Sequence, residues 1–324
     1  MVAHRSKPSG GKPQGQAASA AGGPERHGER IARALARAGV ASRREAERLI
    51  AEGRVSLNGV VLTSPAVNVT DADILLLDGV ATPKRERTRL WLHHKPRGLV
   101  TTHSDPKGRP TVFEALPKDL GRVISVGRLD LTSEGLLLLT NDGDLARKME
   151  LPSGGFVRSY RARAFGRIAQ ERLDALTNGL TVDGVAYGPI KATLERGEGA
   201  NVWIALSLAE GKNREVRKVL DALGLKVNRL IRIAYGPFEL GALAVGAVQE
   251  APSALVERLG RGGEVKTFIG QATEEPKGRG PRARGLQAKP KRRPEETVTE
   301  EKKVYKAGWA KPRVGGLKAS KPKS

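Results

Sequence analysis

The stretch VGRLDLTSEGLLLLTNDG, residues 126–143, decides the fold of the larger part of the chain. Four consecutive leucines, residues 136–139, lie in it between a polar segment and the turn-forming residues 141–143. A short apolar run that ends in turn residues predicts a buried strand followed by a tight turn. This interpretation explains the leucines, but it leaves open what the arginine and aspartate of GRLD do just before the strand.

Asp130, the aspartate of GRLD, has two possible roles. An aspartate followed by Thr132 and Ser133 is most often a turn or capping residue, because its short side chain bonds to nearby backbone amides. The alternative is a carboxylate that a loop presents for chemistry. The neighbouring residues alone do not decide between the two.

RSYRARAFG, residues 158–166, alternates in the way that a strand does. The pattern places Tyr160, Ala162 and Ala164 on one face, and Arg161 and Arg163 on the other. On this pattern alone, Tyr160 is a half-buried packing residue.

EGKNREVRKVLDALG, residues 210–224, predicts a helix with Asn213 as its N-cap and an apolar stripe along one side. Arg217 flanks the stripe, so its guanidinium can reach inward toward a carboxylate. The segment is no phosphate-binding loop, because Leu206 and Asn213 stand where such a loop needs glycine and serine or threonine.

From residue 89 to residue 265, short strand patterns mix irregularly with helical ones. The strand patterns include RLWLHH, RVISVG and NVWIALSL, and the helical ones include DLARKME and AQERLDALTNG. This mixture predicts an α+β domain on a largely antiparallel sheet flanked by helices. Residues 77–88, which contain the charged run KRERT, are typical of a linker before that domain.

Residues 25–76 predict a smaller unit. RIARALARAG and SRREAERLIAEG have helical spacing of apolar residues, and Ser42 and Glu45 stand at capping-box spacing. RVSLNGVVL places Asn58-Gly59 between apolar residues, which predicts a type I′ hairpin. Two helices followed by a hairpin, with basic side chains on and after the second helix, resemble the S4 RNA-binding domain. We expect four side chains to contact RNA, with a solvated helix face as the plainer alternative: Arg43, Arg44, Arg48 and Arg54.

The charge of the chain favours a polyanionic partner. It has 57 Lys and Arg against 35 Asp and Glu, a net charge of +22, and nucleic acid is the leading candidate. More than half of the excess lies in terminal segments rich in Gly, Pro, Ala and Lys, which lack the apolar residues of a core. We expect residues 1–24 and 266–324 to be disordered basic tails.

Several function classes are disfavoured by what the sequence lacks. It has no cysteine, which excludes disulfides and thiolate chemistry. His93 and His94 are adjacent on a predicted strand and therefore face opposite ways, which argues against a metal site. The N-terminal residues lack the apolar core of a signal peptide, and no stretch has the length of a membrane span. We expect a cytoplasmic monomer without a metal or other cofactor.

Four segments, with the S4 unit, are similar to the RsuA/RluB family of rRNA pseudouridine synthases over about residues 28–260. They are LHHKPRGLVTTHSDPKGRPTVFEALP, VGRLDLTSEGLLLLTNDG, SYRARAFG and EGKNREVRKVLDALGLKVNRLIRIAYGPFELGAL, in that order. The resemblance implies an S4 domain followed by a pseudouridine synthase domain. It also implies that Asp130 is the catalytic aspartate, Tyr160 the active-site tyrosine and Arg217 the basic partner of the aspartate.

The implied reaction detaches a uracil base at N1 and rejoins it to the ribose through C5. The carboxylate acts as a nucleophile at the sugar or as a base that forms a glycal, and the sequence does not decide between these routes. An ion pair with Arg217 would keep Asp130 ionised. Tyr160 would relay or accept the C5 proton, or stack on the base.

A uridine stacked in RNA is out of reach of Asp130, so the enzyme must flip it out, at a cost of a few kcal/mol. We expect backbone contacts from Arg128, Lys212 and Arg214 to offset that cost. For Arg128 a structural salt bridge is an equal alternative.

The long basic C-terminal segment favours the large-subunit (23S) rRNA as substrate, as in the RluB branch of the family. A synthase for small-subunit rRNA is the alternative within the class. A non-catalytic rRNA-binding or ribosome-assembly protein is the alternative from another class, and the joint presence of Asp130, Tyr160 and Arg217 argues against it.

Overall fold

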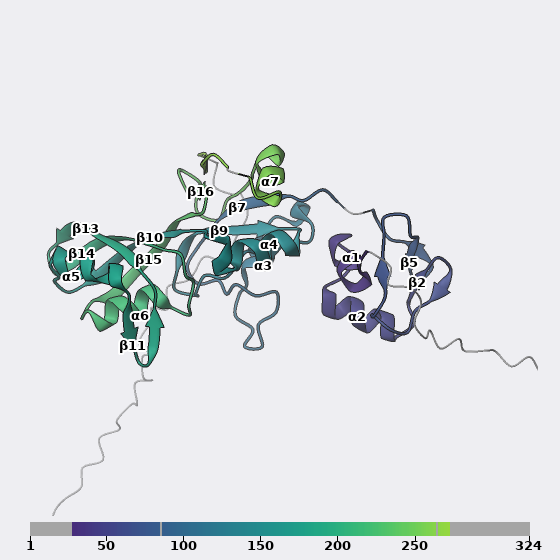
Figure 1. Cartoon of the computed structure of the whole chain (residues 1–324), viewed down its shortest axis with the longest axis horizontal. Coiled ribbons are helices and arrows are strands. Elements are labelled where there is room, and N and C mark those ends of the chain that lie inside the picture. The colour runs from purple at the N-terminus through teal and green to yellow at the C-terminus, as the bar shows by residue number, and fades with distance from the viewer. Residues whose placement is uncertain (1–27, 85, 264, 273–324) are drawn as a thin grey trace, which may run out of the picture. The chain divides into compact units, whose positions relative to one another are not determined.

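The structure, a computed structural model, describes residues 28–84, 86–263 and 265–272. The predicted tail over residues 1–24 lies outside the described residues, and so does the predicted C-terminal tail from residue 273 onward. The described residues form an N-terminal unit and a larger unit from residue 89, each with its own hydrophobic core. Figure 1 labels their helices and strands.

The N-terminal unit has the predicted helices and hairpin. Its elements are β1 (Glu29–Arg30), α1 (Ile31–Arg37), α2 (Arg43–Ala51), β2 (Val55–Leu57), β3 (Val60–Val61), β4 (Asn68–Val69), β5 (Leu75–Leu77) and β6 (Val80–Ala81). Asn58 and Gly59 have φ angles of 51° and 85°, as the predicted type I′ turn requires. Ser42 accepts a hydrogen bond from the Glu45 amide and so caps α2. The Glu45 carboxylate bonds to Arg48 instead, so only half of the predicted capping box forms.

The larger unit is built on one sheet (Figure 1). Its ten strands in the described chain are β7 (Leu90–Lys95), β8 (Ile124–Ser125), β9 (Glu134–Thr140), β10 (Arg158–Phe165), β13 (Ile190–Glu198), β14 (Asn201–Leu208), β15 (Lys226–Tyr235), β16 (Phe238–Glu239), β17 (Val248–Glu250) and β18 (Phe268–Ile269). The main order is β13-β14-β10-β15-β9-β7-β17. Only β9 with β15 and β16 with β18 pair in parallel among the described strands, so the predicted largely antiparallel sheet is confirmed.

Helices cover this sheet. They are α3 (Val112–Ala115), α4 (Gly143–Glu150), α5 (Gln170–Asp174), α6 (Glu215–Ala222) and α7 (Ser253–Gly260), with short 3-10 turns η1 (Lys118–Leu120), η2 (Pro152–Gly154) and η3 (Ala175–Asn178). Side chains of α5 and α6 share a core with β10, β13 and β14, in which Ala162 and Ala164 are fully buried. The predicted alternation of β10 is thereby confirmed. A hairpin of β11 (Leu180–Val182) and β12 (Val185–Tyr187) adjoins this half of the unit.

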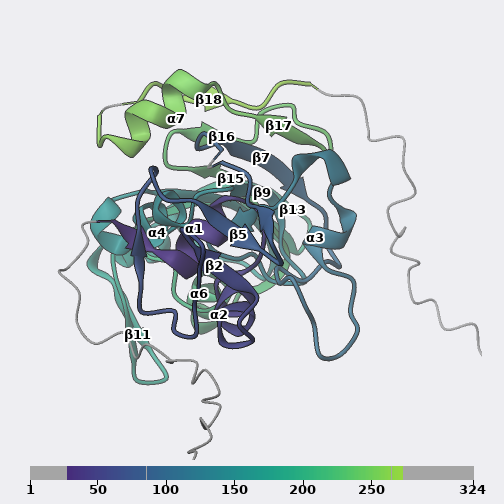
Figure 2. The ribbon, with the colours of Figure 1, turned by 90° about the vertical axis from the view of Figure 1, so that its right-hand side faces the viewer.

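The leucine run is buried on both faces of the sheet. Leu136 and Leu138 pack in a core with α4 and α7, whereas Leu137 and Leu139 pack with α3 and the loops beside it. Two-sided burial explains why the strand is a continuous apolar run rather than an alternating one. Figure 2 shows α7 and β18, the last helix and strand of the described chain, near β16 and β17.

Three predicted details near element ends are wrong. The predicted linker 77–88 starts too early, because Leu77 and β6 belong to the four-stranded sheet of the N-terminal unit. The helix after EGKN has Arg214 as its N-cap, in place of Asn213, and the Arg214 side chain makes no capping bond. The predicted C-terminal tail also starts too early, because Phe268 packs on the core shared by α4 and α7, and β18 pairs with β16. After the leucine strand, Asp142 caps α4 with bonds to the amides of Asp144 and Leu145.

In the part of the chain that the structure describes, no helix has the length and apolar character needed to span a membrane.

Candidate active site

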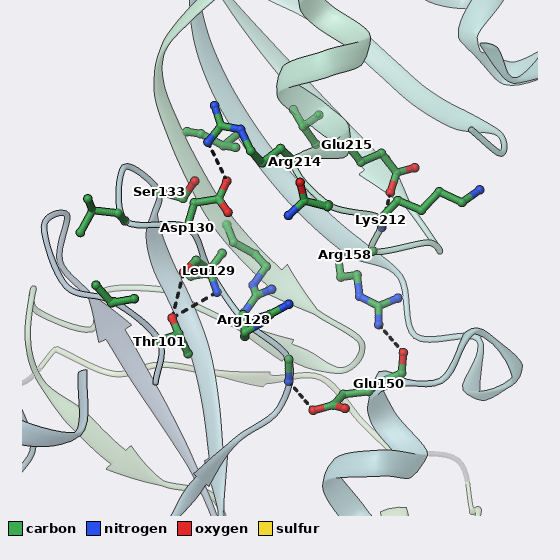
Figure 3. Close-up of a pocket in the computed structure, with 18 of the residues that line it drawn as sticks. Thr101, Arg128, Leu129, Asp130, Ser133, Glu150, Arg158, Lys212, Arg214 and Glu215 are labelled. Atoms are coloured by element: carbon green, nitrogen blue, oxygen red, sulfur yellow. Dashed lines mark hydrogen bonds and ion pairs between the residues drawn. The ribbon is translucent and has the colours of Figure 1, made fainter. Parts of the chain in front are cut away.

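A cavity of about 800 Å³ opens in the larger unit and brings the separate motifs of the sequence together. Residues from GRLD, from β10, from EGKNRE and from β15 line it, and Figure 3 shows the side chains of Asp130 and Arg214 in contact. Its lining residues include Thr101, Arg128, Asp130, Tyr160, Arg214 and Arg232.

Asp130 lies in the loop between β8 and β9, and its carboxylate is partly exposed to the cavity. Its Oδ2 lies 3.3 Å from Nη1 of Arg214. The backbone carbonyl of Asp130 accepts a bond from the Ser133 amide at 3.0 Å, which closes the turn ahead of β9. The carboxylate makes no capping bond to a backbone amide in the described chain, so the turn leaves it free for other partners.

Hydrogen bonds from Thr101 and Lys95 hold the backbone of the loop that carries Asp130. The Thr101 hydroxyl donates to the Leu129 carbonyl at 2.8 Å, and the Leu129 amide donates back to it at 3.3 Å (Figure 3). Lys95, at the end of β7, is fully buried, and its Nζ donates to the carbonyls of Pro96, Asp130 and Ser133 at 3.0 to 3.2 Å. These bonds fix the backbone on both sides of the carboxylate.

Burial of the Lys95 ammonium lowers its pKa to about 8, and the nearby charges of Asp130 and Glu134 oppose that shift. No carboxylate lies within ion-pair distance of its Nζ among the described residues. The three carbonyl bonds are therefore what holds this cation in the protein interior.

Arg214 is held in an unusual backbone conformation. Its φ and ψ are 53° and 30°, in the left-handed region that residues other than glycine rarely adopt. The turn is closed by Glu215, which is buried and whose carboxylate accepts a bond from the Lys212 amide at 2.9 Å. Burial raises the pKa of Glu215. Such strain is common where the surrounding structure holds a functional group in place.

The predicted ion pair between Asp130 and Arg217 is wrong, because Arg214 takes that place. Arg217, half-buried on α6, donates from Nη1 to the Val227 carbonyl at 3.1 Å and from Nη2 to the Thr132 carbonyl at 3.2 Å. Burial lowers its pKa, and the Asp130 charge opposes the shift. Arg217 thus contacts the backbone of the Asp130 loop rather than the carboxylate itself.

Tyr160 lines the same cavity from β10. It is half-buried and packs at the edges of the two cores that meet there. Among the described residues, its hydroxyl has no hydrogen-bond partner. The packing interpretation of the sequence holds for the ring, while the hydroxyl is available to a ligand.

Sequence reasoning missed Arg158, Tyr235 and Arg232, which also line the cavity. Arg158 and Arg232 lie over the Tyr235 ring at 4.7 and 5.1 Å from its centre, and all three are buried. Arg158 donates to the Tyr235 hydroxyl at 2.8 Å and to carbonyls of Phe156, Ala209 and Glu150. An arginine in a strand pattern is normally expected at the surface. The sequence pattern therefore did not indicate that these arginines are buried.

The basic residues that the sequence assigns to RNA binding lie on the surface. Arg128 and Lys212 are exposed and line the cavity, and Lys212 pairs with Glu210 at 2.7 Å. In the N-terminal unit, Arg43 and Arg44 are exposed on α2, Arg48 pairs with Glu45, and Arg54 pairs with Asp78. Their roles in RNA binding stay predictions.

The two adjacent histidines are used structurally. Nδ1 of His93 lies 3.1 Å from the Ala247 carbonyl and Nδ1 of His94 lies 2.8 Å from the Leu243 carbonyl. Burial lowers the pKa of His93 to about 4. The described residues contain no cluster of potential metal ligands.

This arrangement suits chemistry at an electron-poor carbon. A carboxylate beside a guanidinium is a nucleophile or a base, and the rigid loop holds it in one direction. The several cations around it suit a phosphate-bearing substrate.

Comparison with known proteins identifies two domains in the chain. The S4 domain family matches residues 29–75, and the RNA pseudouridylate synthase family matches residues 89–222. A crystal structure of a pseudouridylate synthase is 26% identical, with a TM-score of 0.50, over 71% of this chain and 99% of that chain.

Curated relatives cover both domains. An uncharacterized RNA pseudouridine synthase of Rickettsia felis is 46% identical over 230 residues, which are 71% of this chain and 100% of that protein. Ribosomal large subunit pseudouridine synthase B of Salmonella typhi is 43% identical over 220 residues, 65% of this chain and 75% of that protein. The corresponding protein of Yersinia pestis is 41% identical over 219 residues, 66% of this chain and 69% of that protein. With its S4 domain and its synthase domain, the chain belongs to the RsuA/RluB family of pseudouridine synthases.

Proposed function

We propose that this pseudouridine synthase isomerises a uridine of the large-subunit rRNA, with Asp130 as the catalytic carboxylate. The observation that carries the assignment is the Asp130 carboxylate, which a backbone-anchored loop presents to the cavity beside Arg214. Relatives named large subunit pseudouridine synthase B support the choice of subunit.

In the first step, the bond between C1′ of the ribose and N1 of the base breaks, and its electron pair leaves with the uracil. Asp130 either forms a bond to C1′ or removes a proton from C2′, and both routes need an ionised carboxylate. Arg214 lies beside this carboxylate, with its Nη1 3.3 Å from Oδ2, and helps to fix its direction.

In the second step, the base turns and C5 forms a bond to C1′. If Asp130 was bonded to C1′, that bond breaks and frees the carboxylate; if Asp130 took the C2′ proton, it returns that proton to C2′. The C5 proton is then lost and N1 gains a proton. Tyr160, with its hydroxyl unbonded in the described structure, relays the C5 proton or supports the turned base with its ring.

Backbone contacts bring the rRNA to this site. The exposed arginines of α2, together with Arg128 and Lys212, contact phosphates and offset the cost of flipping the uridine. We further propose that the N-terminal unit, which ends with β6, and the larger unit, which starts with β7, act as separate domains. The protein acts as a cytoplasmic monomer on its rRNA.

Pseudouridine mapping of rRNA from cells that lack the protein tests the substrate. Loss of one modified position in the large-subunit rRNA is the expected result. Loss of a position in the small subunit instead would assign the alternative substrate. An unchanged map of both subunits would refute rRNA modification altogether.

Replacement of Asp130 by asparagine tests the catalytic assignment. Asp130→Asn should abolish pseudouridine formation in a purified system and leave rRNA affinity within a few-fold, because the amide keeps the size of the side chain but cannot act as nucleophile or base. Asp119→Asn, at an exposed position outside the cavity, is the matched control and should turn over normally. Substantial activity of Asp130→Asn would remove Asp130 from the mechanism.

A further inference from the structure

Arg232 is a buried cation of the cavity that the steps above do not use. It lies on β15, only 3% of its surface is exposed, and it lines the cavity together with Asp130 and Tyr160. Its Nε donates to the Leu136 carbonyl at 2.7 Å. Its Nη2 is buried and has no hydrogen-bond partner among the described residues.

The neighbouring Arg158 differs from Arg232 in this respect. Both guanidiniums stack on the Tyr235 ring, but the Arg158 donors bond to several carbonyls and to the Tyr235 hydroxyl. No carboxylate lies within ion-pair distance of Arg232 in the described chain. A buried charge without a counter-ion is costly, so its position calls for an anion that arrives during the reaction cycle.

The sheet fixes where Arg232 stands. It pairs with Tyr160 on β10 and with Gly135 on β9, the strand that begins just after Asp130. A Cβ on Gly135 would lie 2.3 Å from the Arg232 carbonyl oxygen, so the two strands are in close contact at this point. The Arg232 backbone is therefore held between β9 and β10, beside an irregularity in the pairing with β10, and lies opposite Gly135 and Tyr160.

The proposed reaction generates one anion at this place. When the bond between C1′ and N1 breaks, the uracil carries the electron pair, and its negative charge spreads to the carbonyl oxygens of the ring. This holds for both possible roles of Asp130. A preorganised cation in a water-poor site stabilises such developing charge strongly, because it needs no reorganisation when the charge appears.

We propose that Arg232 is a catalytic residue that stabilises the departing uracil anion, through its guanidinium charge at the cavity wall. The proposal rests on the proposed function, since it assumes that the base is detached in this cavity. A contact to an RNA phosphate is the rival role, and it would be made equally in the ground state and the transition state.

The test compares uridine with 5-fluorouridine at the modified position of an rRNA fragment, in single turnovers at saturating enzyme. Fluorine makes the base more acidic, so its anion needs less stabilisation by the protein. Because fluorine at C5 blocks the final proton loss, consumption of the starting nucleotide is what is measured for both substrates.

Arg232→Gln should lower the uridine rate about 100-fold or more, the usual effect of losing one donor to a developing anion. Its 5-fluorouridine rate should fall at least several-fold less. Arg232→Lys should lie between the wild type and Arg232→Gln, and it serves as the test protein if the glutamine variant does not fold. Arg163→Gln is the matched control, because its Nε is also buried without a partner but the residue does not line the cavity. It should leave both rates unchanged.

Equal losses on the two substrates would overturn the proposal, because a residue that only supports the fold does not respond to the leaving group. Weaker RNA binding with normal saturated rates would also overturn it and would assign a phosphate contact. If the wild-type protein consumes neither substrate, the proposed function fails instead.

Discussion

Two arginines act on Asp130 in different ways. Arg214 contacts the carboxylate, whereas Arg217 donates to the Thr132 carbonyl two residues further along the loop. The first sets the charge near the carboxylate and the second sets its position. A displacement of the loop by about 1 Å is enough to cost roughly 100-fold in rate.

Arg217→Ala should therefore lower the single-turnover rate about 100-fold without a large change in rRNA affinity. Arg217→Lys should be milder, because an ammonium can still donate to the Thr132 carbonyl although the second bond, to Val227, is absent. Lys218→Ala, an exposed neighbour on α6, is the control for the helix. A normal rate in Arg217→Ala would show that the loop holds its position without this arginine.

Lys95 gives the protein a defined dependence on pH. Its pKa is about 8 in the folded state against about 10.5 for a free lysine, because the folded state buries the ammonium. Between these values the unfolded chain binds more protons, so this residue makes the free energy of unfolding rise with pH.

The change that tests this is Lys95→Met, which removes the titrating group. Urea unfolding of both proteins from pH 7 to pH 10 should show the wild type gaining stability relative to the variant above about pH 8. The contributions of all other titrating groups cancel when the free energy of unfolding of the variant is subtracted from that of the wild type. A constant difference across this range would mean that the folded state does not perturb Lys95.

The residues proposed for catalysis differ in how far the sequence predicts them. Motif resemblance points to Asp130 and Tyr160, and the structure places both in one cavity. It also pairs Arg217 with the aspartate, but the left-handed turn at Arg214 brings that residue to the carboxylate instead. A backbone angle of this kind depends on tertiary contacts, so residue spacing cannot reveal it. The sequence did not predict the roles of Lys95 and Arg232 for a related reason, since the burial of both depends on strands that are distant in sequence.

Among the elements, β9 shows best how the sequence determines the fold. Its leucines predict a buried strand, and the structure buries them on both faces of the sheet. The strands β7, β8 and β15 pair with it. The parallel pairing with β15 was beyond the sequence pattern, because it joins residues almost a hundred positions apart. The close approach at Gly135 is the local feature that makes this pairing possible.

Gly135→Ala should consequently destabilise the synthase domain severely, by about 4 kcal/mol or more. The residue has φ of +104°, and the added Cβ would meet the backbone of Arg232 at 2.3 Å, where nothing flexible can move aside. Gly155→Ala is the matched control: its φ is +65°, and its Cβ would meet nothing within 4 Å. It should cost only about 1 to 2 kcal/mol. Urea denaturation of both variants measures the two effects, and similar losses would mean that the strands can separate at little cost.

On the scale of the whole molecule, charge is distributed unevenly along the chain. Residues 276–324 hold 16 basic and 4 acidic side chains, more than half of the net charge of +22, and they lie outside the described residues. We expect a segment of this composition to contribute to RNA binding by releasing counterions from phosphates, without reading sequence.

Removal of residues 276–324 should weaken rRNA binding at low salt and leave the modified position unchanged. The slope of log K against log salt should decrease in magnitude by about 0.7 to 0.9 for each phosphate that the protein no longer neutralises. Replacing the segment with an uncharged Gly/Ser segment of equal length should have the same effect as the deletion, because charge and not length attracts the phosphates. Titration of an rRNA fragment at several salt concentrations measures the three slopes. If all three proteins have the same slope, the basic segment does not bind the RNA, and the S4 and synthase domains account for the whole electrostatic attraction.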